Sequence, residues 1–87
     1  HEYRYPSDDY IITIYYEGKK LQYRLKQYHI DRQATYWHLF TKSEVHELKL
    51  TTATRQLEHI TIHGQVPFPN SFIEVLQKEV LQIVLGE

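Results

Sequence analysis

The alternation of apolar and polar residues predicts a β-hairpin near the start of the chain. Residues 10–16 (YIITIYY) are dense in β-branched and aromatic side chains, and residues 19–28 (KKLQYRLKQY) alternate regularly. The turn at 17–18, Glu-Gly, provides a glycine where a two-residue turn needs a positive φ. With this turn the apolar faces of the two strands coincide. The expected pairs are Tyr16 with Lys19, Ile14 with Leu21, Ile12 with Tyr23, Ile11 with Arg24, Thr13 with Gln22 and Tyr15 with Lys20.

The third strand is predicted at residues 34–41 (ATYWHLFT), and both of its faces carry large apolar side chains. Its alternate residues form two faces, with Trp37 and Leu39 on one and Tyr36, His38 and Phe40 on the other. A three-residue loop at 30–32 brings the tryptophan face next to Leu25 and Tyr23, and we expect that face to be buried. The alternative is a flipped strand, with the tyrosine and the phenylalanine inward.

Two more strands are predicted at residues 45–50 (VHELKL) and 57–63 (LEHITIH), joined by a loop at 51–56. The residues expected to face inward from these two strands are Leu48, Leu50, Ile60 and Ile62.

A helix is predicted at residues 72–85, after an extended segment whose two prolines resist helix formation. Ser71 and Glu74 fit a capping box at its start, and Gly86 suits the position after its end. On a helical wheel one arc of about 120° is apolar. It contains Phe72, Ile73, Leu76, Val80, Ile83 and Val84. The apolar residues outside this arc, which we expect on the outer side, are Val75, Leu81 and Leu85.

The order of these elements predicts an α+β fold. We expect a five-stranded antiparallel meander sheet with one C-terminal helix packed on one face. Residues 1–9 have no regular period and are interpreted as a flexible N-terminal arm, and residues 10–87 as a single small domain. The chain begins at His1 and has no methionine, which is typical of a processed or excised domain.

Composition narrows the functional classes without selecting one. The hydrophobic fraction is 41% and the charged fraction 24%, as in ordinary globular chains. The absence of cysteine excludes disulfides, thiolate metal sites and thiol nucleophiles. The net charge is −1, although residues 17–33 carry five basic and two acidic side chains. No apolar run is long enough to span a membrane, so no membrane partner is expected.

His59 and His63 are spaced four residues apart, which on a helix would suggest half of a metal site. On a strand, residues four apart are separated by roughly 13 Å, whereas Zn–N bonds are about 2 Å. The two histidines therefore cannot share an ion, even with Glu47 near His63. We interpret both as solvated side chains opposite Ile60 and Ile62, and we expect no metal.

Neither the serines nor the glycines form a recognisable catalytic or phosphate-binding pattern. Each glycine has a turn or cap position, and the Asp8-Asp9 pair lies in the expected arm. We therefore expect a non-enzymatic domain without a cofactor.

The face of the sheet that one helix leaves open carries the candidate site. Its partner-binding residues are expected to be Tyr15, Arg24, Lys26, Tyr36, His38 and Phe40, with Ile11 and Tyr28 beside them. This apolar surface is larger than monomers usually expose. We expect it to bind a protein, either a second copy in a homodimer or a foreign partner or domain. Leu81 and Leu85 on the outer side of the helix would add to such an interface.

Single-stranded nucleic acid is the alternative partner. Basic and aromatic side chains interleave on strands 19–28 and 34–41, which is how several sheets stack bases. The slightly negative net charge makes this partner the less favoured one.

Overall fold

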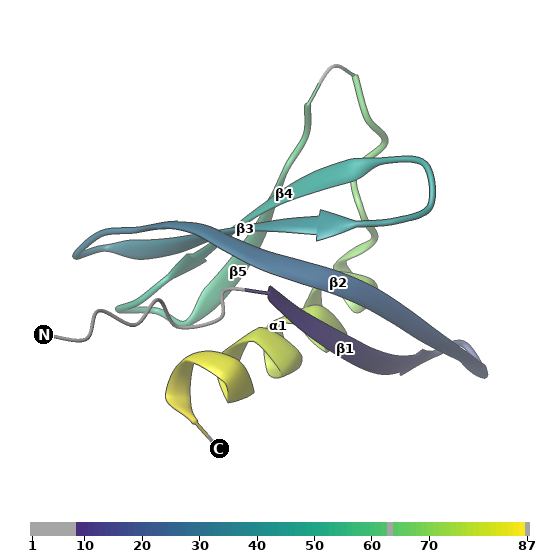
Figure 1. Ribbon diagram of the computed structural model, residues 1–87, viewed down its shortest axis with the longest axis horizontal. Helices are drawn as coiled ribbons and strands as arrows, with labels where there is room; N and C mark the ends of the chain where they lie inside the picture. The colour runs from purple at the N-terminus through teal and green to yellow at the C-terminus, as the bar shows by residue number, and fades with distance from the viewer. Residues whose placement is uncertain (1–8, 63, 87) are drawn as a thin grey trace, which may run out of the picture.

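The chain forms a five-stranded antiparallel sheet with a helix on one face, as the sequence predicts (Figure 1). The computed structural model describes residues 9–62 and 64–86. The strands follow in chain order and each pairs with the next. They are β1 (Asp9–Tyr16), β2 (Lys19–Ile30), β3 (Ala34–Phe40), β4 (Val45–Thr51) and β5 (Gln56–Ile60). The helix, α1 (Asn70–Leu85), contacts the two outermost strands, β1 and β5. None of the described helical residues forms a segment suited to crossing a membrane.

The β1–β2 hairpin has the predicted register at every expected pair. Glu17 and Gly18 both have positive φ, 52° and 75°, as a tight hairpin turn with the twist of its strands requires. β1 begins at Asp9, the last residue of the expected arm, and residues 1–8 of that arm lie outside the described part of the chain.

The predicted face of β3 is buried, but its partners on β2 differ from the prediction. Trp37 and Leu39 have no exposed surface. Leu25 pairs with Leu39, so β3 is shifted along β2 by two residues from the expected pairing. Next to the loop Ile30 pairs with Thr35, three residues beyond the expected register, and a bulge at Tyr28, which the alternating pattern does not reveal, moves the pairing back by one residue. The loop is correspondingly 31–33, where the Asp31 carboxylate accepts backbone N–H groups and its pKa is lowered.

The core lies between the inner face of the sheet and α1. Its buried apolar side chains come from every strand and from the helix. They are Ile12, Ile14, Leu25, Trp37, Leu39, Leu48, Leu50, Leu57, Phe72, Leu76 and Val80. The indole N–H of Trp37 donates to Thr35 Oγ1 at 2.9 Å, so this buried donor is satisfied.

β5 is shorter than predicted, and its faces are reversed. The strand ends at Ile60, which is 36% exposed on the face away from α1, while Leu57 and His59 face inward. The turn after β4 aligns Leu57 with Leu50, two apolar residues, and His59 follows two residues later on the same face. The expectations of an inward Ile60 and a solvated His59 are both wrong.

The start of α1 differs from the predicted capping box of Ser71 and Glu74. The N-cap is Pro69, in an extended conformation and without a side-chain cap. Its carbonyl accepts the backbone N–H groups of Phe72 and Ile73, each at 3.0 Å. The Ser71 hydroxyl instead lies 2.7 Å from the Tyr16 hydroxyl on β1, so it ties the helix to the sheet. The predicted end is confirmed, because Gly86 adopts a left-handed conformation.

The buried face of α1 is wider than the predicted arc, because the helix meets both edge strands. Of the predicted stripe, Phe72, Leu76 and Val80 are buried, Ile73 and Ile83 pack at its margin, and Val84 is exposed. Val75 and Leu81 also pack against the core, so their expected outward position is wrong. Leu85 is exposed as expected.

Candidate functional site

The six predicted site residues all lie on the face of the sheet opposite α1, which we call the outer face. Tyr15 lies near the hairpin turn, opposite Lys20, and is 70% exposed. The other five belong to neighbouring positions of β2 and β3. Arg24 pairs with Phe40, and Lys26 pairs with His38, while Tyr36 follows on β3.

Three cross-strand rows make up the centre of the outer face. The Phe40 row contains Ile11, Arg24, Phe40 and Val45. The His38 row contains Asp9, Lys26, His38, Glu47 and Ile60. The Tyr36 row contains His29, Tyr36, Lys49 and Glu58. The exposed apolar residues of these rows, Ile11, Val45 and Ile60, surround the half-buried aromatic side chains of β3.

Tyr28, the bulge residue on β2, contacts side chains of both β3 and β4 on the outer face. Its ring stacks on His38 with centroids 4.0 Å apart and planes 15° apart. Its hydroxyl donates to the Glu47 carboxylate on β4. Burial, followed by this hydrogen bond and the charge of Glu47, raises the pKa of Tyr28 to about 12. The contact therefore fixes a neutral tyrosine over the middle of β3.

The basic side chains of the outer face differ in how they are held. The Arg24 guanidinium lies 4.9 Å from the centroid of the Phe40 ring, and its Nε is 3.2 Å from Asp9 Oδ1. Lys49 Nζ lies 6.0 Å from the centroid of the Tyr36 ring. Lys26 is exposed and belongs to none of the ion pairs within the described residues. It is therefore the basic group of the centre that is open to a partner.

Charge is divided across the outer face. β2 contributes the basic groups Lys20, Arg24 and Lys26, whereas β4 and β5 contribute Glu47 and Glu58 on either side of Lys49. The aromatic residues of β3 lie between the two sides. The face therefore has a basic half, an aromatic centre and a half with an acidic excess.

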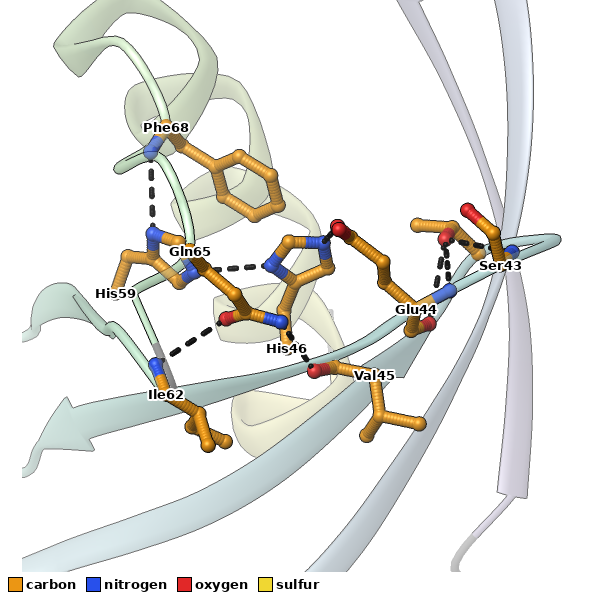
Figure 2. Close-up of polar contacts among 9 residues, drawn as sticks. Ser43, Glu44, Val45, His46, His59, Ile62, Gln65 and Phe68 are labelled. Carbon is orange, nitrogen blue, oxygen red and sulfur yellow. Dashed lines mark hydrogen bonds and ion pairs between the residues drawn. The ribbon is translucent and has the colours of Figure 1, made fainter.

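A second cluster, which we call the histidine pair, consists of His46 on β4 and His59 on β5 (Figure 2). His46 is only 4% exposed. Its Nδ1 lies 3.1 Å from His59 Nε2, and its Nε2 lies 2.9 Å from Glu44 Oε1. The ring of Phe68 stacks on His59 at 4.1 Å and lies 4.5 Å from His46. Four side chains from three segments therefore form one compact unit on the inner side of the sheet.

The hydrogen bonds of the histidine pair run in one direction. The backbone N–H of Phe68 can only donate, and it donates to His59 Nδ1 at 3.1 Å. The neutral His59 ring therefore carries its proton on Nε2, which donates to His46 Nδ1. His46 in turn carries its proton on Nε2 and donates it to Glu44. Both tautomers are thus fixed by a backbone donor at one end and a carboxylate at the other.

The histidine pair anchors the connection between β5 and α1, of which the structure describes residues 61–62 and 64–69, and we call these residues the crossover. Gln65 provides a second anchor. Its Oε1 accepts the Ile62 N–H at 3.3 Å, and its Nε2 donates to the Val45 carbonyl at 2.9 Å (Figure 2). One side chain thereby spans β4 and residue 62, beyond the point where β5 ends.

The direction of the hydrogen bonds at His46 and His59 also disfavours metal binding between the two rings. His59 Nε2 carries a proton, and His46 Nδ1 accepts it, so neither nitrogen between the rings presents a lone pair to an ion. No group of three or more metal-ligating side chains occurs within residues 9–62 and 64–86. The expectations for His63, including its position near Glu47, concern a residue outside the described part of the chain.

The histidine pair was not predicted from the sequence because its partners are distant in the sequence. One signal was available: His46 and Leu48 alternate on β4, so an inward Leu48 also implies an inward His46. A buried histidine requires hydrogen-bond partners, and these come from a turn and from a backbone N–H.

Comparison of the chain with protein-family models, with curated proteins and with solved structures gives no match.

Proposed function

We propose that this domain is a non-enzymatic protein-interaction module that binds a second copy of itself through the outer face of the sheet. The observation that carries the proposal is the division of this face into a basic half and a half with an acidic excess, on either side of an aromatic centre. Such a surface is complementary to itself. The apolar residues Ile11, Val45 and Ile60 are exposed around it, as at interfaces.

A twofold axis that is parallel to β3 and lies between the two facing sheets would bring the oppositely charged halves of the two copies together. Rotation about such an axis places β2 of one copy over β4 of the other and keeps each cross-strand row facing its own counterpart. Lys26 of one copy then faces Glu47 of the other, because both residues belong to the His38 row. His38 and Phe40 face their own counterparts at the centre. An axis perpendicular to the strands would place the basic β2 strands over each other, which is unfavourable.

The first test is the solution mass. Light scattering on a sizing column over a tenfold concentration range should give twice the chain mass of 10.5 kDa at the upper end. A monomer at every concentration would overturn the proposal. Phe40→Asp should give a monomer of unchanged circular dichroism, because Phe40 is on the outer face rather than in the core. Val66→Asp puts the same charge on an exposed residue of the crossover and should leave the dimer intact.

A charge exchange tests the twofold axis itself. Lys26→Glu and Glu47→Lys should each weaken association by about tenfold or more, because like charges then meet twice in every dimer. An equimolar mixture of the two variants should associate again, since both contacts of the mixed dimer pair opposite charges. Failure of the mixture to associate would contradict the pairing of Lys26 with Glu47.

Binding of single-stranded oligonucleotides at low and high salt tests the alternative. A protein that remains a monomer but binds oligonucleotides, with affinity falling steeply with salt, would replace self-association with nucleic-acid binding. The stacking of Tyr28 on His38 and the two glutamates of the face argue against that outcome, because they occupy ring surfaces and repel phosphate.

A further inference from the structure

The bonds of the histidine pair exist only while both rings are neutral. His59 Nδ1 accepts the Phe68 N–H, so a second proton on His59 would turn two N–H groups toward each other. A second proton on His46 must go to Nδ1, the atom that accepts from His59. A second proton on either ring therefore removes one of the hydrogen bonds that run from Phe68 through the two histidines to Glu44.

We propose that the histidine pair is an acid-operated latch, which holds the crossover against β4 and β5 at neutral pH and releases it when His59 is protonated. The release breaks the connection between His59 and the backbone of Phe68. It concerns the inner side of the sheet and is independent of the proposed self-association through the outer face.

The surroundings of the pair set the direction of the pH effect. Burial, followed by the neighbouring His46, lowers the pKa of His59 below its ordinary value of 6.5. A histidine whose pKa is lower in the closed form takes up a proton more readily in the open form. The latch is therefore fully effective above about pH 6.5 and weakens as the pH falls toward the pKa of the closed form.

The elements packed around the pair contribute few other charges. The β3–β4 turn contributes Glu44, whose carboxylate accepts from His46. β5 contributes Glu58, which lines the same shallow hollow as His59. β3 places the uncharged Leu39 opposite His46, and α1 places the uncharged Ile73 at the hollow. The charged side chains that the described neighbouring elements place beside the pair are thus Glu44 and Glu58.

Release of the crossover has a structural consequence at the sheet. The Phe68 ring would leave both imidazoles and the Phe72 ring, whose centroid is 4.9 Å away. If the movement includes Gln65, the Val45 carbonyl loses the side-chain amide that now pairs with it. Acid would thereby uncover apolar side chains and the first backbone groups of β4.

Amide hydrogen exchange tests the latch in the intact protein. After correction for the intrinsic pH dependence of exchange, the protection of the Phe68 amide should fall tenfold or more between pH 7.5 and pH 5.0, since uptake of one proton changes an opening equilibrium by up to tenfold per pH unit. The Leu48 amide in the sheet should lose much less protection. Equal protection of the Phe68 amide at both values would overturn the proposal.

Two variants assign the effect to His59. In His59→Asn, an amide oxygen can still accept the Phe68 N–H but does not titrate, so the fall in protection should disappear. His29→Gln removes an exposed histidine at the other end of the sheet and should retain the fall. A fall that persists in His59→Asn would assign it to another group and overturn the latch.

The wild-type tautomers provide a test that needs no variant. Nitrogen-15 chemical shifts of the imidazoles should show both protons on Nε2 at pH 7.5. A proton on Nδ1 of His59 would contradict the direction of these hydrogen bonds and overturn the latch.

Discussion

At the scale of single residues, Tyr28 has the largest effect on the outer face. As the extra residue of a bulge, it points to the same face as its neighbour His29, and both rings contact Tyr36. Its own ring covers His38, and its hydroxyl reaches β4. One inserted residue therefore brings side chains of three strands into contact.

The ionisation of Tyr28 provides a prediction at this scale. Its pKa of about 12 lies above the ordinary value of 10, so its contribution to stability is present below pH 10 and is lost as the pH rises toward 12. Glu47→Gln should lower the pKa of Tyr28 without restoring 10, because burial is the larger cause. NMR titration of the Tyr28 ring measures this. A wild-type Tyr28 ring that titrates at the ordinary value of 10 would contradict the contact.

The residue scale also shows where prediction from sequence reaches its limit. The six residues expected on the open face are on it, since alternation along a strand fixes the face once one apolar residue is placed. The environment of His59 was predicted wrongly. Its partners are a side chain on another strand and a backbone N–H in the crossover, and no periodicity encodes such contacts.

At the scale of elements, agreement between independent signals separates the correct predictions from the wrong ones. The β1–β2 register was predicted because the turn residues and both apolar faces require the same pairing. In β5 the pattern allowed two orientations, because Leu57 and Ile60 point to opposite faces of the strand. The turn after β4 places Leu57 opposite Leu50, which turns Leu57 inward and Ile60 outward. The capping box at Ser71 failed because the serine hydroxyl has a partner on β1 and Pro69 caps the helix with its carbonyl.

The hairpin turn offers a stability prediction at this scale. Glu17 adopts a positive φ of 52°, which costs free energy for a residue other than glycine, asparagine or aspartate. Glu17→Asn should therefore increase the free energy of unfolding by roughly 0.5–1 kcal/mol. Urea denaturation measures the change. Gly18→Ala, at a φ of 75°, is the opposite control and should destabilise the protein; a stabilising Gly18→Ala would contradict the turn conformation.

At the scale of the whole molecule, stability depends on one contact between two layers. α1 supplies the apolar cover of the inner face, with Leu76 and Val80 fully buried against the sheet. Trp37, equally buried, reports on this contact from the sheet side. A domain with one such core should unfold in a single cooperative transition.

Helix variants test this dependence. Leu76→Ala should lower the free energy of unfolding by about 2–5 kcal/mol, because it leaves a cavity between the layers. Leu85→Ala, at an exposed position of the same helix, should cost less than about 1 kcal/mol. Denaturation followed by Trp37 fluorescence and by far-ultraviolet circular dichroism should give coincident curves. Curves with different midpoints would contradict a single core.

The meander order has a consequence for how the chain reaches this structure during synthesis. Each strand pairs with the one made just before it, so the sheet can assemble from local contacts as the chain is made. Its inner face nevertheless stays uncovered until residues 70–85 have left the ribosome, because α1 is the last of these elements to be made. Until then, Trp37 and its neighbours are exposed to other nascent chains, a state that favours aggregation and chaperone binding. Synthesis of α1 is therefore required before the inner face of the sheet can be covered.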